Sequence, residues 1–122
     1  MKQNYDSLNQ VDGLNYVQLT PISFLQRAQD VYADHPAIIY GEKTYTWKET
    51  AKRCRRLASA LKNLDVTKGS TVAMMAMNTP ELAEAHFGIP MSGGVLNAIN
   101  TRLDADTAVS YTHLTLPTTS RV

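Results

Sequence analysis

The sequence lacks the features of a disulfide-bonded, membrane-spanning or strongly charged protein. Its 122 residues include a single cysteine, Cys54, so no disulfide can form within the chain. Twelve basic and eleven acidic side chains give a formal net charge of +1, which does not favour nucleic acid or an anionic membrane as partner. No apolar run approaches the roughly 20 residues of a transmembrane helix, and the start MKQNYDSLNQVDG lacks the apolar core of a signal peptide. By default we expect one cytoplasmic domain.

The common phosphate-binding motifs are also missing. The stretch Ser92-Gly93-Gly94 fits neither GxxxxGK[ST] nor GxGxxG. It follows a predicted helix and precedes a predicted strand, whereas an anion cradle needs its amides at the start of a helix. We therefore interpret it as a structural turn. Nothing in the chain forms a set of nucleophile, base and oxyanion donors, so we assign no catalytic, cofactor-binding or metal-binding residue.

Several polar or reactive side chains are better explained by structure than by chemistry. A basic cluster supported by Glu49 is predicted to be a solvated helix face, because no aromatic residues interleave for base stacking. Cys54 falls on the apolar stripe of the same helix, which predicts a buried, inert thiol. The cluster consists of Lys52, Arg53, Arg55 and Arg56.

Three other groups of residues are also better explained by a structural role than by a chemical one. The histidines lie far apart without a cysteine or carboxylate at ligand spacing, which disfavours a metal site. The methionines of an apolar run are expected to fill the core, and two asparagines near a strand end are expected to bind backbone or water. The residues are His35, His86 and His113, then Met74, Met75 and Met77, then Asn97 and Asn100.

Three helices are predicted, and each begins at a threonine. Thr20-Pro21 and Thr79-Pro80 place a capping residue before a proline at the first helical position, and Thr46-x-x-Glu49 is a capping box. Pro90 is expected to kink or end the third helix. The apolar faces predicted from the helical spacing comprise Phe24, Leu25, Ala28, Val31 and Tyr32, then Trp47, Ala51, Cys54, Leu57, Ala58, Leu61 and Leu64, then Leu82, Ala85, His86 and Ile89.

The predicted strands form two groups. Residues 37–40 and 43–46 are joined at Gly41-Glu42, which suits a tight hairpin. Residues 71–77 are almost continuously apolar, as in a parallel strand covered on both faces, and residues 95–99 form a second strand. The order helix, hairpin, helix, strand, helix, strand predicts an α/β fold with a right-handed parallel crossover.

Two long segments carry a resemblance to a known family. NYVQLTPISFLQRAQDVYADHPAIIYGEKTYTWKETAKRCRRLASAL and TKGSTVAMMAMNTPELAEAHFGIPMSGGVLNAINTRLDADT resemble the N-terminal region of the adenylate-forming (AMP-binding) acyl-CoA synthetases. The resemblance is greatest to bacterial and plant acyl-activating enzymes that use short- and medium-chain acids. Its specific elements are LTPISFL, YTWKET and HFGIPMSGGVLNAINTRLD, and it runs from about Asn15 to Thr107.

The resemblance implies a ligase of carboxylic acids. Such enzymes join an acid to ATP with the help of Mg²⁺, release pyrophosphate, and pass the acyl group from the acyl-adenylate to coenzyme A. In that family the phosphate loop, the adenine and ribose contacts and the catalytic lysine come later in the chain. The resemblance therefore assigns no catalytic, cofactor or metal residue here, and it matches the segment from Asn97 to Asp104 to scaffold only.

We expect three segments along the chain: a polar, poorly ordered lead-in over 1–18, a partial AMP-binding domain over 19–109, and an aberrant tail over 110–122. The end of the chain, AVSYTHLTLPTTSRV, leaves the family pattern, and SYTHLTLPTTSRV resembles translated cloning-adaptor sequence. Native sequence is therefore expected to end near Ala108 or Val109. A genomic read that continues these codons would contradict this expectation.

The resulting interpretation is a truncated N-terminal part of the large domain of an acyl-CoA synthetase. We expect the fragment to be inactive and prone to aggregation or self-association, because its central strands expose apolar faces. ATP, Mg²⁺, CoA and a small carboxylic acid would serve the full-length parent, which would be cytoplasmic, or peroxisomal if it comes from a plant. Two alternatives remain. One is a stand-alone α/β binding module with residues 1–18 as a partner-binding arm; the other is a flavodoxin-type nucleotide-binding protein, which the missing phosphate loop disfavours.

Overall fold

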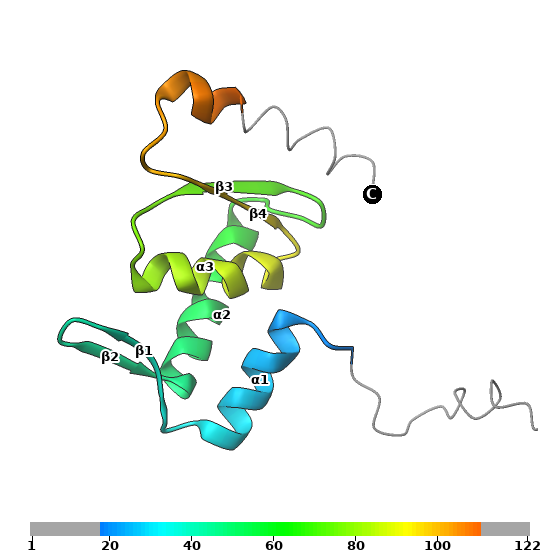
Figure 1. Ribbon diagram of the computed structural model, residues 1–122. Coiled ribbons are helices and arrows are strands. Elements are labelled where there is room, and N and C mark those ends of the chain that lie inside the picture. Colours follow the sequence, from blue (N-terminus) through cyan, green and yellow to red (C-terminus); the bar gives the residue numbers. More distant parts are fainter. Residues whose placement is uncertain (1–17, 111–122) are drawn as a thin grey trace, which may run out of the picture.

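The computed structural model describes residues 18–110, which form helices and strands in the predicted order (Figure 1). Residues 105–110 form a further helical segment. The α/β fold class predicted from the sequence is confirmed. The elements are α1 (Pro21–Tyr32), β1 (Pro36–Tyr40), β2 (Lys43–Thr46), α2 (Trp47–Asn63), β3 (Thr71–Met75), α3 (Pro80–Met91) and β4 (Val95–Ile99).

All three helices begin where the threonines predict. The Thr46 hydroxyl accepts the Glu49 amide at 3.2 Å, and the Glu49 carboxylate accepts the Thr46 amide at 2.9 Å, which completes the predicted capping box. Thr20 caps α1 in the same way with Ser23, a partner that we had not predicted. α3 continues one residue past Pro90 and ends at Met91, close to the predicted stop.

The strands form two separate pairs among the described residues. β1 and β2 are antiparallel around Gly41, whose φ of 58° is the left-handed value that glycine adopts without strain. β3 and β4 are parallel and joined through α3, with Thr71 opposite Val95 and Met75 opposite Ile99. The predicted hairpin and the predicted parallel crossover are therefore both present.

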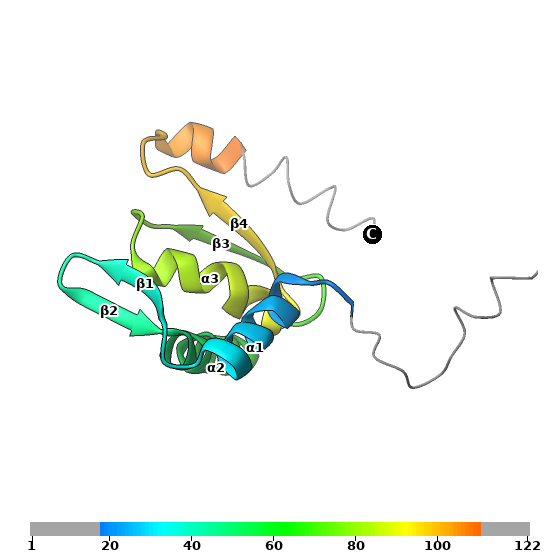
Figure 2. The ribbon, with the colours of Figure 1, turned by 60° about the horizontal axis from the view of Figure 1, so that its bottom comes forward.

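The core lies between the helices. Leu25 of α1 packs with Ala51 and Cys54 of α2, and all three are at most 1% exposed. Gly88 of α3 allows a close approach to α2, because a Cβ added there would lie 2.7 Å from a methyl group of Leu57. Figures 1 and 2 show α3 beneath the β3–β4 sheet, with α2 and α1 farther from the sheet.

The sheet is less covered than the sequence predicts. Met75 is 51% exposed and Met77 74%, so the run is not buried on both faces and these methionines are not core filler. The reason is that α1, α2 and α3 all lie on one side of this sheet, so that alternate side chains of β3 face away from them.

Some helical side chains that we predicted to be buried also lie at the surface. In α1 only Leu25 is fully buried, because α2 and α3 cover one side of that helix. Leu64 lies at the carboxyl end of α2, where the chain turns away from the core. His86 is on the exposed side of α3. The exposed apolar residues of the two predicted stripes are Phe24, Val31, Tyr32 and Leu64.

Candidate functional site

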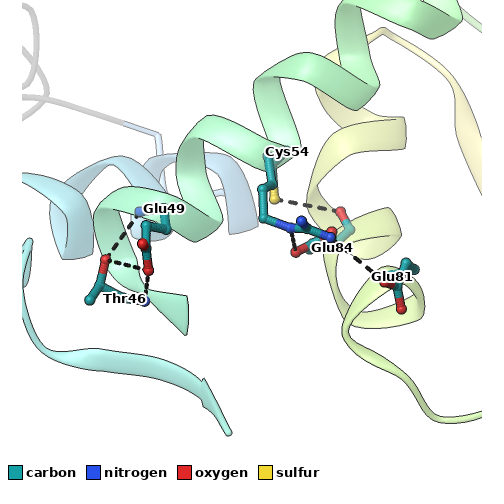
Figure 3. Close-up of polar contacts among 6 residues, drawn as sticks. Thr46, Glu49, Cys54, Glu81 and Glu84 are labelled. Carbon is teal, nitrogen blue, oxygen red and sulfur yellow. Dashed lines mark hydrogen bonds and ion pairs between the residues drawn. The ribbon is translucent and has the colours of Figure 1, made fainter. Parts of the chain in front are cut away.

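The main polar cluster lies between α2 and α3, where Arg53 meets Glu81 and Glu84; Figure 3 labels the two glutamates. The Arg53 Nε donates a hydrogen bond to the nearly buried Glu84 carboxylate, and its Nη2 lies 3.7 Å from a carboxylate oxygen of Glu81. The guanidinium carbon also lies 4.5 Å from the centre of the Tyr45 ring, a cation–π contact with β2. Arg53 thus connects α2, α3 and the hairpin.

This geometry corrects the prediction of a solvated basic face at Arg53, while the other three residues of the cluster are exposed. Glu49 serves the helix cap rather than the basic cluster, and Arg53 is only 34% exposed at its side chain. Arg55 donates a hydrogen bond to the Gln29 side chain at 2.8 Å. Lys52, Arg55 and Arg56 are exposed as predicted. Arg53 is therefore the one member of the cluster that leaves the predicted solvated face.

The charges in this cluster stabilise one another. The hydrogen bond that Arg53 donates to Glu84 raises the pKa of the guanidinium above its ordinary value. Hydrogen bonds from the backbone amide of Glu81 and from the Thr79 hydroxyl lower the pKa of the Glu81 carboxyl, and Arg53 lowers it further. Because the buried carboxylate of Glu84 already has a cationic partner, this cluster holds the helices together rather than offering a ligand site.

Cys54 is the buried, inert thiol that the apolar stripe predicts. It is fully buried, and its Sγ lies 3.7 Å from the Glu84 carbonyl oxygen, to which it donates. Burial and, to a smaller extent, the nearby Glu84 raise the pKa of the thiol to about 11. A thiol that stays protonated and out of solvent is a poor nucleophile.

The Ser92-Gly93-Gly94 stretch is a turn, as predicted. The Ser92 amide donates to the Gly88 carbonyl at 3.2 Å, and the Gly93 amide donates to the Pro90 carbonyl at 3.0 Å. The Gly94 amide donates to the Ile89 carbonyl at 3.2 Å. All three amides are engaged at the carboxyl end of α3, so they cannot also cradle a phosphate.

The asparagines and histidines take structural positions. The Asn100 side chain accepts the Arg102 amide at 2.9 Å, as predicted for a residue that binds backbone, and Asn97 and Asn100 line a small cavity of about 180 Å³. His86 Nδ1 lies 2.8 Å from the Leu82 carbonyl oxygen, and His35 packs edge-on against Tyr32. His113 lies outside the described residues. Within residues 18–110, no three potential metal ligands come together.

Glu84 is the residue that sequence reasoning missed. It is separated from Arg53 by 31 positions in the chain, so no local spacing could indicate the pair. A glutamate among apolar positions of a helix was the available signal, because a carboxylate is seldom buried without a partner.

A family model described as AMP-binding enzyme matches residues 25–114. The chain belongs to this family. It is 53% identical over 93 residues to a peroxisomal acetate/butyrate–CoA ligase of Arabidopsis thaliana, covering 76% of this chain and 16% of that ligase. A peroxisomal trans-cinnamate:CoA ligase of Petunia hybrida is 52% identical over 92 residues, with 75% and 16% covered. The matched part of the chain thus spans only 16% of the length of each of these curated relatives.

Two solved structures share this fold. The N-terminal subdomain of NpsA from Klebsiella oxytoca aligns with a TM-score of 0.75 and 22% identity, covering 79% of this chain and 25% of that one. The anthranilate CoA ligase AuaEII, solved with anthranoyl-AMP, aligns with a TM-score of 0.70 and 24% identity over 76% of this chain and 18% of its own. The fold prediction, an N-terminal part of the AMP-binding domain, is therefore confirmed.

Over residues 18–110, the helices are too short or too polar to span a bilayer.

Proposed function

We propose that the chain is the N-terminal part of an ATP-dependent acyl-CoA ligase. The reaction would convert a carboxylic acid, ATP and CoA to acyl-CoA, AMP and pyrophosphate through an acyl-adenylate. The observation that supports this proposal is sequence similarity to enzymes named as CoA ligases. The acetate/butyrate enzyme, for example, is 53% identical to this chain over 93 residues. The alternative of a stand-alone binding module has no comparable support.

The described residues would act as scaffold in this reaction. The one cysteine among them is buried, the amides of the 92–94 turn are engaged, and Arg53 is paired with Glu84. ATP, Mg²⁺ and CoA would then be held by residues of the full-length protein outside this segment. We expect the 122-residue chain to release no pyrophosphate above background with ATP, Mg²⁺ and an acid.

The test compares this chain with the full-length protein in an ATP–pyrophosphate exchange assay. Exchange by the full-length protein and none by the 122-residue chain is the expected result. Exchange by the short chain would contradict its role as scaffold, and a folded full-length protein with no exchange on any acid would contradict the ligase proposal.

We propose a short- or medium-chain acid as the substrate. The names of the relatives give acetate and butyrate, but also benzoate and trans-cinnamate. The specificity constant of the full-length protein would be measured for acetate, butyrate, hexanoate, benzoate and cinnamate. Higher values for the three aliphatic acids are expected, whereas a preference for either aromatic acid would contradict this substrate class.

The proposed compartment is the peroxisome, which the names of several relatives give for those enzymes. This refines the cytoplasmic expectation based on the absence of a signal peptide. A fluorescent protein fused to the N-terminus of the full-length chain should coincide with a peroxisomal marker. Diffuse cytoplasmic fluorescence would return the assignment to the cytoplasm.

The segment boundaries 1–18, 19–109 and 110–122 are proposed on the sequence pattern. Reading the gene beyond Val109 tests the last of these boundaries, with codons unlike SYTHLTLPTTSRV expected there.

A further inference from the structure

The outer side of α1 carries a groove of about 550 Å³, which we call the α1 groove. Its apolar lining residues, Leu19, Phe24 and Val31, are 83%, 56% and 60% exposed. Arg27 and Asp30 add one positive and one negative charge to the same lining. An exposed apolar groove bordered by charged side chains is typical of a binding surface.

The chain enters the α1 groove where its described part begins. The hydroxyl of Ser23, a lining residue, donates a hydrogen bond to the Gln18 carbonyl at 2.9 Å, and the next residue, Leu19, also lines the groove. Residues 1–17 are therefore joined to the groove at its edge. Such a direct connection gives a segment an effective concentration of the order of millimolar. A second copy of the chain has no such advantage.

Residues 1–17 also carry apolar side chains at a regular spacing, although the segment is polar overall. An extended chain with three residues per turn places every third side chain on one side, at intervals of about 9 Å. Phe24 and Val31, seven positions apart in α1, are separated by about 10 Å along the helix axis. The two spacings are similar. The apolar residues at every third position are Tyr5, Leu8, Val11, Leu14 and Val17.

We infer that residues 11–17 fold back along α1 and fill the α1 groove of their own chain. Seven extended residues reach about 20 Å, which is enough to follow a helix of 12 residues, about 18 Å long. With the segment antiparallel to the helix, Leu14 would face Phe24, and Val11 would face Val31. Part of the lead-in that was expected to be poorly ordered would thus be held by its own first helix.

The charges of the segment fit this alignment. Asp12 lies between Val11 and Leu14 in the segment, and Arg27 lies between Phe24 and Val31 in the helix. The aligned segment therefore brings a carboxylate to the arginine that lines the groove, which adds a favourable charge contact at its edge.

The experiment follows cleavage of the complete 122-residue chain by a protease that cuts before aspartate. Asp12 lies within the docked segment, whereas Asp6 lies before it and serves as the internal reference. A synthetic peptide of residues 1–17 gives the ratio of the two cleavage rates in the free segment. In the wild-type chain, cleavage before Asp12 should be slowed at least about fivefold relative to this ratio, because the segment must leave the groove before it is cut.

Phe24→Lys and Val31→Lys, tested separately, should each abolish most of this protection, because each places a charge against the apolar side of the segment. Ile39→Lys is the matched control. It introduces the same charge at an exposed aliphatic position, 71% exposed compared with 60% for Val31, but on the hairpin. Its cleavage should equal that of the wild type, and circular dichroism should confirm that all four chains are folded alike.

Four results would overturn the inference. They are a wild-type chain cut in the same ratio as the peptide, protection that persists in both groove variants, Ile39→Lys losing as much protection as they do, and protection that increases with protein concentration. The last result would identify a second copy as the cover. The inference does not rest on the ligase proposal, because no nucleotide or acid takes part in the measurement.

Discussion

The α2–α3 contact and the β3–β4 sheet are both rich in apolar residues, yet they differ in how much of them is buried. Ala85 and Ile89 of α3 are at most 2% exposed, whereas Met75 of β3 is 51% exposed. α3 contacts both α2 and β4, while α1, α2 and α3 all lie on the same side of the sheet. The difference in burial predicts that the contacts among the helices contribute more to stability than the outer side chains of the sheet do.

The strongest test of this comparison substitutes one apolar residue in each region. Ile89→Ala should lower the free energy of unfolding by about 2–5 kcal/mol, or unfold the chain, because it removes buried methyl groups and leaves a cavity. Met75→Ala should change it by less than about 0.5 kcal/mol, because the side chain is half exposed. Urea denaturation followed by circular dichroism measures both. Equal losses would remove the distinction between the regions.

The second test concerns the ion pair that fastens α2 to α3. Arg53→Met should lower the free energy of unfolding by about 2 kcal/mol, less than the ~3–5 kcal/mol of a fully buried pair, because the guanidinium is partly exposed. The loss arises because Glu84 would be left buried without its cation. In a double-mutant cycle, Arg53→Met with Glu84→Gln should cost less than the sum of the single changes, and additive losses would show that the pair is not coupled.

The third test uses pH. The pKa of the Cys54 thiol is about 11 in the folded chain against an ordinary 9.0, because the thiol is buried. The unfolded chain therefore releases this proton at lower pH, so the stability that depends on the thiol is complete below about pH 9 and is lost as the pH rises through 11.

Ionisation of Cys54 in the unfolded chain should accordingly lower the free energy of unfolding by about 1 kcal/mol between neutral pH and pH 10. Cys54→Ala is the control, because it lacks the thiol but retains the lysines and tyrosines that also titrate in this pH range. Denaturation at several pH values measures both chains. A wild-type decline no steeper than that of Cys54→Ala would contradict burial of the thiol.

The smallest effect is expected at the start of α2, where stability depends on a local contact. Thr46→Ala should cost about 1 kcal/mol or less, because the Glu49 amide loses its hydroxyl acceptor. Thr44→Ala, an exposed position on the same strand that caps no helix, serves as the control. Thermal melts compare the two, and an equal shift in both variants would argue against the capping box.

The features predicted correctly are those that depend on residues close together in the sequence. The Thr46–Glu49 box spans three positions, and the Gly41 turn spans two. Both features could be predicted from the sequence because the interacting groups are close together in the chain. The family resemblance was also visible in the sequence, and the match over residues 25–114 confirms it.

The features that were missed depend on contacts between distant elements. Arg53 was expected to be solvated with the rest of its cluster, but it pairs with Glu84 on another helix. The methionines were expected to be core, but Met75 and Met77 face outward. Neither the ion pair nor the exposure of the methionines has a signal in the nearby sequence, because each depends on which other element packs against the residue.

By itself, the sequence determined the family, the order of helices and strands, and where each helix begins. These properties follow from hydrogen bonds within a single turn and from apolar periodicity along one segment. Only the tertiary structure decided which apolar faces are buried, which arginine finds a carboxylate, and that the amides of the 92–94 turn are already engaged. Burial and charge pairing are properties of two surfaces in contact, and the partner surface is fixed only when the chain has folded.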